Sequence, residues 1–382
     1  MGRFAFVTWD GGGNLPPAVG IAQALAARGH ECRFLGYEVQ RRRLEALGFG
    51  FSALDQSGDF DARGLAPDHL AAALLRNVWA CPAHLEDIPA ALAKHPAEML
   101  VVDFLMQGAL AAGAHLSVPV AALAHSSVAG LIPPPESPVG AARLAAANEL
   151  RSAAGLGPMG RLNDAWDPFL TIVTTIAELD LAAADAGPTV RYVGPIVERV
   201  APGTWDSPWD SGDSRPLVLV SFSTTGFWGQ SGRIRNTLAA LAGEPVRVLV
   251  STSDRLDLAS LPANAAVRSF VPHALLLPSV SLTVTHCGHG TLTASLAHGV
   301  PLVGLPNRAA DQPFLARRVD QLGAGLALDG EAEPEEIRSA VREVLARPCY
   351  AAAARRLAVA IAASPGAAGA ARELERGMLD RG

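Results

Sequence analysis

The sequence predicts an α/β protein made of two domains, each built on a doubly wound parallel sheet. Its 382 residues are too many for one ordinary domain and suit two of about 190 residues each. Short apolar runs alternate with helical patterns, which is the rhythm of βαβ units. The rhythm stops at Val197–Arg215, a stretch rich in Pro, Gly, Ser and Trp, and starts again at Leu217.

In the first half of the chain, apolar β-branched and aromatic residues mark the strands, and glycines end the first two helices. The predicted strands are Phe4–Trp9, Glu31–Gly36, Glu98–Asp103, Val118–Ala124, Pro168–Thr175 and Tyr192–Val193. The predicted helices are Ala18–Arg28, Glu38–Leu47, Asp68–Trp79, Glu86–Ala93 and Phe104–His115. The predicted loops are Phe51–Leu65, rich in Gly and Asp, and Leu131–Val139, which has four prolines.

The second half continues the same pattern. Its predicted strands are Leu217–Ser221, Val246–Ser251, Ala266–Phe270 and Ser281–Thr285, followed by a further apolar run at Val300–Leu305. Its predicted helices are Glu333–Ala346, Cys349–Ala363 and Gly369–Leu379. Crossovers between parallel strands are right-handed, and such sheets bind ligands at the carboxyl ends of their strands. Polar residues that directly follow strands are therefore the candidates for function.

Composition limits the classes of partner. The net charge of −6 argues against nucleic acid or an anionic membrane as a partner. The four cysteines form no C-x-x-C pair and are expected to be free thiols in a reducing compartment. The chain starts with a strand pattern rather than a signal peptide, and no apolar run reaches membrane-spanning length. We therefore expect a cytoplasmic soluble enzyme, and a homodimer is left open.

The most informative stretch is Val284–Gln312, where a strand leads through a glycine-rich turn into a short helical pattern. Glycines let a ligand approach the backbone, and the first N–H groups of a helix have no partner within the helix. His286 stands at the strand end, and Thr291 is placed to cap the helix or to bond a phosphate oxygen. After the next apolar run, Asp311 and Gln312 supply side chains that read hydroxyl groups. This arrangement predicts a site for a diphosphate beside a polyol.

The series H-x-G-x-G-T, G-V-P and D-Q in this stretch resembles the donor signature of the GT-B glycosyltransferases of family 1, which use nucleotide-sugars. The resemblance implies two Rossmann-like domains facing across a cleft. It implies an acceptor-binding domain at residues 1–200, a linker at 201–214 and a donor-binding domain at 215–360. In that family the last helix, here within residues 361–382, crosses back onto the N-terminal domain.

The resemblance also implies roles at the donor site. His286 would donate a hydrogen bond to the diphosphate, and Asp311 and Gln312 would bind the sugar. The phosphates would further meet the residues Gly288, His289, Gly290, Thr291, Ser223 and Thr224. Phe270 would stack on the nucleobase and the backbone of Val271 would read its edge. Each feature also has a purely structural interpretation, namely a buried histidine, a packing glycine turn, Ser/Thr turn chemistry or a strand end broken by Pro272.

Two details refine the donor. The family uses no metal, and His286 with His289 lacks the further ligands that a structural zinc ion needs. Many relatives hold the ribose with a Glu where this chain has Ala294. A deoxyribose has fewer hydroxyls to satisfy, which favours a dTDP-sugar over a UDP-sugar. Ser295 or a backbone carbonyl could replace the missing Glu.

The catalytic base is the open question. The first strand-to-helix turn of relatives usually reads G-H-x-N-P, with the His as base, but Gly12 takes that position here. The triple glycine is not a dinucleotide-binding fingerprint. Asp103, Asp10 and His125 each follow or end a strand, and we rank them as candidate bases in that order. Each could instead be a helix cap or a buried hydrogen-bond partner.

The sequence thus predicts an inverting glycosyltransferase that moves a sugar, favouring a deoxysugar, to a small phenolic or polycyclic natural product. Phenols are more acidic than alcohols and need less help from a base. Two alternatives stay open. One is C-glycosyl transfer to an electron-rich aromatic carbon. The other is a non-catalytic auxiliary protein that binds a nucleotide-sugar or a partner transferase.

Overall fold

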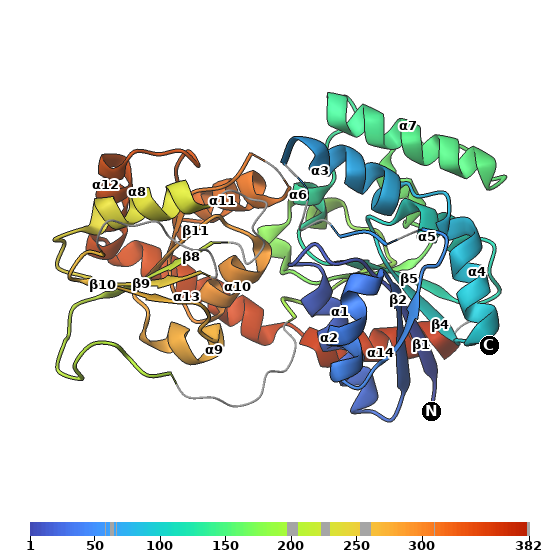
Figure 1. Ribbon diagram of the computed structural model, residues 1–382, viewed down its shortest axis with the longest axis horizontal. Coiled ribbons are helices and arrows are strands. Elements are labelled where there is room, and N and C mark those ends of the chain that lie inside the picture. Colours follow the sequence, from blue (N-terminus) through green and yellow to red (C-terminus); the bar gives the residue numbers. More distant parts are fainter. Residues whose placement is uncertain are drawn as a thin grey trace. The chain divides into compact units, whose positions relative to one another are not determined.

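The structure is a computed structural model that describes residues 1–57, 59–61, 65, 67–196, 205–222, 230–252, 261–308 and 310–379. The chain divides into two compact units (Figure 1). Unit 1 comprises Met1–Arg199 and Pro365–Gly382, and unit 2 comprises Val200–Ser364. Each unit is an α/β domain with one parallel sheet, which confirms the predicted fold class.

Unit 1 contains a seven-stranded sheet with the order β3-β2-β1-β4-β5-β6-β7. All its neighbouring strands are parallel. The strands are β1 (Arg3–Val7), β2 (Glu31–Gly36), β3 (Gly50–Ala53), β4 (Met99–Asp103), β5 (Val120–Ala124), β6 (Leu170–Val173) and β7 (Val190–Tyr192). Both β4 and β5 are buried along their whole length, as expected for central strands of a sheet covered on both faces.

The helices of unit 1 fill the crossovers. They are α1 (Leu15–Ala26), α2 (Arg41–Ala46), α3 (Pro67–Leu74), α4 (His84–Lys94), α5 (Gln107–Gly113), α6 (Val128–Leu131), α7 (Pro138–Ala153) and α14 (Gly366–Leu379). Shorter helical turns are η1 (Glu38–Gln40), the π-helical η3 (Leu75–Trp79), η4 (Leu162–Ala165), η5 (Ala177–Leu179) and η6 (Leu181–Asp185). Residues of α1, α2 and α14 share one core cluster with alternate residues of β1 and β2. Prolines occupy the first turn of α1, where their missing N–H costs no intrahelical bond.

The last helix, α14, packs on unit 1 beside α1 (Figure 1). Leu374 is fully buried in the core that α1 and β1 form. Glu375 accepts from Arg28 Nε at 2.6 Å and lies 2.7 Å from His30 Nε2. The helix is therefore held by apolar burial along one face and by ion pairs at its rim.

Unit 2 contains a six-stranded sheet with the order β10-β9-β8-β11-β12-β13. Its strands are β8 (Leu217–Ser221), β9 (Arg247–Ser251), β10 (Ala265–Arg268), β11 (Leu282–Thr285), β12 (Leu302–Gly304) and β13 (Gly325–Ala327). Its helices are α8 (Ser231–Leu241), α9 (His273–Leu276), the turn η8 (Leu277–Ser279), α10 (His289–Ala297), α11 (Gln312–Gln321), α12 (Pro334–Ala346) and α13 (Pro348–Ala363). Along β8, Val218 and Val220 join the core under α8 and α12, whereas Leu217 and Leu219 join the core on the other face.

Several elements differ from the sequence prediction, among them the helices α6, α8, α9 and α11, which were not predicted. Strand β3 lies in the stretch predicted as the loop Phe51–Leu65, because four residues at a sheet edge give too short an apolar pattern. Helix α7 begins inside the predicted loop Leu131–Val139 and continues through a region given no element. Strand β13 was also not predicted. None of the helices that the structure describes combines the length and apolar character needed to cross a membrane.

The two sheets repeat one topology. In each, the chain first builds outward from a central strand and then crosses back to build the other half. The connections therefore leave in opposite directions at β1 and β4 in unit 1, and at β8 and β11 in unit 2. Such a switch point opens a crevice at the carboxyl ends of the two strands, where ligands bind. The predicted site residues that follow β1, β4 and β11 flank these two points.

Candidate active site

In unit 2, the turn after β11 brings a histidine ring over a glycine. His286 follows β11 directly, and Cys287 adopts a left-handed backbone with φ of 61°. Gly288 is the residue before α10. A Cβ at position 288 would lie 2.4 Å from His286 Nε2. Glycine is therefore required at position 288, because any side chain there would displace the imidazole.

The imidazole of His286 is enclosed and neutral. Its residue is 7% exposed, and burial, reinforced by the charge of Arg233, lowers the pKa of His286 to about 4. Its Nδ1 atom is buried without a hydrogen bond to the described residues. A buried polar atom without a partner costs free energy, on the order of 1–3 kcal/mol. This nitrogen, at the carboxyl end of β11, is therefore a candidate to bond a ligand.

Arg233 is a functional candidate that sequence analysis missed. It lies in the first turn of α8 and is only 9% exposed. Its Nε donates to the carbonyl of Gly330 at 2.9 Å, and its Nη2 donates to Glu331 at 2.8 Å. The charge of Arg233 helps to lower the pKa of His286, so this buried cation acts electrostatically on the glycine turn. The available signal was an arginine in the first turn of the helix that follows the switch-point strand β8.

The start of α10 is accessible around the same turn. Gly288 and His289 are half-buried, Gly290 is exposed, and Thr291 is half-buried. The hydroxyl of Thr291 makes no hydrogen bond within the described part of the chain. The first N–H groups of this nine-residue helix, which have no partner within the helix, therefore lie at a small accessible surface. The hydroxyl of Thr291 lies at the same surface.

The residues predicted to bind the sugar lie at the start of α11. Asp311 is 8% exposed and directly precedes the helix. Gln312 is 3% exposed, and its Oε1 accepts from the backbone N–H of Asn307 at 3.0 Å. Gln312 thus shapes the loop after β12. The structure places both residues after β12, the strand next to β11, at the same edge of the sheet.

Around the predicted nucleobase site, Phe270 is 68% exposed, whereas Val271 is 5% exposed and belongs to the core. An exposed phenyl ring just after β10 is available for stacking. Ser223 and Thr224 lie outside the residues that the structure describes. Ser295 is fully buried and donates to Thr283 Oγ1 at 3.0 Å. The alternative that Ser295 replaces the ribose-binding Glu is therefore wrong, because its hydroxyl faces the interior.

In unit 1, the glycine turn after β1 is held by polar side chains. Gly12 N–H donates to Asp10 Oδ1 at 3.0 Å, and Gly11 N–H donates to Asn14 Oδ1 at 2.8 Å. Asn14 Nδ2 donates in turn to Asp103 Oδ2 at 3.2 Å. Gly12 has φ of 87°, a conformation that disfavours any side chain. Asp10 therefore builds the turn, and Asn14 connects it to the end of β4.

Asp103 and His125 meet at the carboxyl ends of the neighbouring strands β4 and β5. His125 Nδ1 lies 3.0 Å from Asp103 Oδ2. The geometry falls short of a hydrogen bond, so Nδ1 is enclosed beside the carboxylate in a close polar contact. Asp103 Oδ1 accepts from the N–H of Leu105 at 3.0 Å, and the residue is 3% exposed. Two of the three candidate bases are thus in contact.

Asp180 fixes the loop that carries His125. Its carboxylate accepts from Ser127 Oγ at 2.9 Å, from Val128 N–H at 2.8 Å and from Ala129 N–H at 3.1 Å. Tyr192 also donates to Asp180, at 2.9 Å, and burial together with this carboxylate raises the pKa of the Tyr192 phenol. These four bonds hold the chain just after β5 in one conformation. Asp180 is a supporting residue that sequence analysis did not identify.

Comparison with known proteins identifies the family. Residues 233–376 match the family described as Erythromycin biosynthesis protein CIII-like, C-terminal domain. The chain is 30% identical to 4'-demethylrebeccamycin synthase of Lentzea aerocolonigenes over 93% of this chain and 94% of that protein. It belongs to the glycosyltransferases of natural-product biosynthesis.

Solved structures agree on the fold of this glycosyltransferase. The crystal structure of the glycotransferase of kitacinnamycin has a TM-score of 0.81 and 22% identity, covering 98% of both chains. The spinosyn rhamnosyltransferase SpnG complexed with thymidine diphosphate has a TM-score of 0.74 and 21% identity, covering 98% of this chain and all of that one. Both likenesses confirm the GT-B fold.

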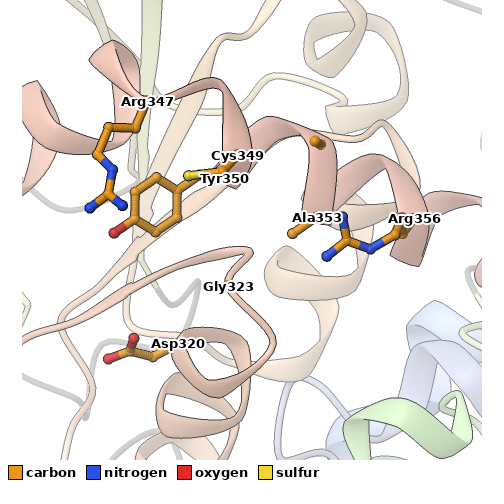
Figure 2. A pocket seen from close by; sticks show the side chains of 8 residues that line it. Asp320, Gly323, Arg347, Cys349, Tyr350, Ala353 and Arg356 are labelled. Carbon is orange, nitrogen blue, oxygen red and sulfur yellow. The ribbon is translucent and has the colours of Figure 1, made fainter.

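The glycosyltransferase also has a hollow of about 370 Å³ at the opposite edge of the second sheet (Figure 2). Its lining comes from the end of α11, including Asp320, and from the start of α13, including Arg347 and Tyr350. Gly323 precedes β13, so the hollow lies at the amino-terminal edge of the strands. Glu343 already pairs with Arg347 and accepts from the Tyr350 hydroxyl. The hollow is therefore separate from the glycine turn and its chemistry.

Proposed function

We propose that this protein transfers a sugar from a nucleoside diphosphate to a small phenolic or polycyclic acceptor, with inversion at the sugar carbon and without a metal ion. The observation that carries the proposal is the enclosed, neutral His286 ring over the glycine turn. A neutral imidazole can donate one hydrogen bond to a phosphate oxygen, and its orphaned Nδ1 has no other role in the described structure.

The leaving diphosphate carries negative charge that grows as its bond to the sugar breaks. Three features near His286 favour such charge. They are the N–H groups at the start of α10, the open hydroxyl of Thr291 and the buried guanidinium of Arg233. Together they provide donors and a cation where other transferases use a divalent metal. This combination supports metal-independent transfer.

The nucleoside half of the donor fits a deoxyribose. Ala294 is half-buried against an apolar cluster, and Ser295 is bonded inside the fold. Neither position can hold ribose hydroxyls with a side chain, so dTDP is favoured over UDP. Phe270 offers an exposed ring on which thymine can stack. A spinosyn rhamnosyltransferase with the same fold was solved with thymidine diphosphate, which supports the same donor class.

The sugar would meet Asp311 and Gln312, which lie close to the diphosphate turn through the β11–β12 pairing. Asp311 supplies a carboxylate for sugar hydroxyls. Gln312 already accepts from Asn307, so its amide N–H groups are the part left to the sugar. Rebeccamycin, named in a relative that matches along most of its length, supports a natural-product acceptor.

Nucleotide binding gives the direct test of this function. We expect dTDP to raise the thermal melting temperature more than UDP does, and we expect EDTA to leave this effect unchanged. At about one hundred times its dissociation constant, a ligand adds about 2.7 kcal/mol to stability. The measurement is a thermal-shift titration with dTDP, UDP and dTMP, followed by turnover assays with and without EDTA. A protein that responds to no nucleotide, or a strict requirement for a divalent ion in turnover, would contradict the proposal.

A further inference from the structure

We propose that His125 is the catalytic base of the transfer and that Asp103 orients it. This inference rests on the proposed sugar transfer and reverses the order in which sequence analysis ranked the two residues. It assigns the base to a different strand from the one that carries it in the resembling family. Four observations lead to it.

The turn after β1 offers Asp10 as its one candidate base, and that carboxylate is already used in the turn. Gly12, which takes the place of the usual histidine, has no side chain and a left-handed backbone. Asp10 uses its Oδ1 to accept from the N–H of Gly12. Its carboxylate is therefore engaged in making the turn. We therefore look for the proton acceptor on a neighbouring strand.

Asp103 is placed to orient a base. It is 3% exposed, its Oδ1 accepts from Leu105 N–H, and its Oδ2 accepts from Asn14. A base that takes a proton from an acceptor must reach the acceptor, and this carboxylate is sealed on both oxygens. The same Oδ2 lies 3.0 Å from His125 Nδ1, so the remaining interaction of Asp103 is with an imidazole.

The strand order explains how the base could move. Strand β4 lies between β1 and β5, so Asp103 at its end is adjacent to the loops of both neighbours. In the resembling family the base is a histidine of the turn after β1. Here that turn holds Gly12 and Asn14, and the imidazole beside Asp103 comes from the β5 side.

His125 has the geometry of a base held by an acid. Its Nδ1 faces Asp103, which favours the tautomer with the proton on Nδ1 and a lone pair on Nε2. Nε2 makes no hydrogen bond to the described residues and, unlike Nδ1, is not fully enclosed. The ring packs edge-on against Phe104, with centroids 5.5 Å apart. Asp180 fixes the loop that follows.

The chemical step balances with these groups. The acceptor oxygen forms a bond to the anomeric carbon as the bond from that carbon to the diphosphate oxygen breaks. The diphosphate leaves with the bonding electron pair. The acceptor proton moves to His125 Nε2, and the resulting imidazolium is stabilised by the Asp103 carboxylate, which stays ionised.

The test compares His125→Asn with Asp103→Asn, using dTDP-glucose and dTDP-rhamnose as donors and a series of ring-substituted phenols as acceptors. Asparagine at position 125 can keep an N–H near Asp103 but has no Nε2. We expect this variant to lose about 10²–10⁴ in turnover with 4-methoxyphenol and much less with the more acidic 4-nitrophenol. Asp103→Asn should show the same dependence on acceptor acidity. The double variant should be little worse than either single one, because the two residues act as a unit.

Two further measurements separate chemistry from folding. The dissociation constant of dTDP should be unchanged in all variants, since the donor site lies in unit 2. His115→Asn, which removes an exposed imidazole, should keep full turnover. If His125→Asn binds dTDP and turns over 4-methoxyphenol at the wild-type rate, the inference is overturned. If the wild type fails to bind dTDP, the proposed function itself fails.

Discussion

The two units share one sheet topology but surround their histidines with opposite charges. His286 in unit 2 has a cation, Arg233, as its influential neighbour, whereas His125 in unit 1 contacts a carboxylate. Both follow a strand at or next to the switch point of a sheet with the same order. An imidazole beside a cation stays neutral and donates to anions. An imidazole beside an acid is prepared to accept a proton.

The comparison shows that the sheet topology fixes where the two histidines lie. The charged residue near each imidazole then decides whether the ring donates a hydrogen bond or accepts a proton. The backbone at the two turns is also similar, since a left-handed residue occurs in each, at Gly12 and at Cys287. Only the turn of unit 2 places an imidazole over a glycine. The turn of unit 1 is instead held by Asp10 and Asn14, which leaves the base to β5.

Among changes at the donor site, the largest effect should come from removing the imidazole of unit 2. His286→Ala should lower turnover by about 10²–10³, because a donor to growing negative charge is lost. The loss should appear in kcat with saturating dTDP-sugar, since the interaction strengthens as the diphosphate leaves. His298→Ala is the matched control, because it removes an exposed histidine at the other end of α10. Equal turnover in the two variants would show that the helix start alone stabilises the diphosphate.

The second prediction concerns acid stability, because each unit contains a histidine whose pKa burial lowers to about 4. Burial lowers the pKa of His84 in unit 1 and of His286 in unit 2 to about 4, from an ordinary value of 6.5. Between these values the unfolded chain binds a proton and the folded chain does not. Stability is therefore complete above about pH 6.5 and falls as the pH drops toward 4, by up to about 3 kcal/mol for each histidine.

Urea unfolding at pH 7 and pH 5 measures this loss. His84→Gln can keep a contact with the Tyr37 hydroxyl, which lies 3.1 Å from His84 Nε2, while it removes the titrating ring. The destabilisation between pH 7 and pH 5 should be smaller in His84→Gln than in the wild type. His115→Gln removes an exposed imidazole and should leave the destabilisation as large as in the wild type. A protein equally stable at both pH values would show that the buried rings relax and take up protons.

The strand, turn and helix around His286 could be predicted from sequence because these residues are contiguous. His286 to Thr291 form one strand-turn-helix unit, so their mutual placement follows from local geometry alone. The strands β2 and β8 were also predicted with the observed boundaries. Such features can be predicted because turn-forming residues and the spacing of apolar residues determine structure over only a few positions.

The relations that needed the structure join residues far apart in the chain. The ranking of Asp103 before His125 ignored their contact, which depends on the pairing of β4 with β5. Arg233 was missed because its proximity to His286 depends on the pairing of β8 with β11. Helix α7 was missed since its many alanines blur the helical apolar pattern. The direction of a side chain could not be predicted either. Ser295 is an example, because its hydroxyl faces Thr283.

The smallest of the expected effects tests the charge that distinguishes unit 2 from unit 1. Arg233→Gln removes the cation beside His286 and should weaken dTDP binding about tenfold, or about 1.4 kcal/mol. A modest value is expected because Arg233 already pairs with Glu331 and because water screens part of the diphosphate charge. Isothermal titration at low salt measures the change. Arg342→Gln is the matched control, since it removes an exposed arginine of the same unit that pairs with Glu244. Equal dTDP affinity in both variants would mean that the N–H groups of α10 and His286 hold the diphosphate without a cation. Arg233 would then affect only the protonation of His286 and not the binding of the donor.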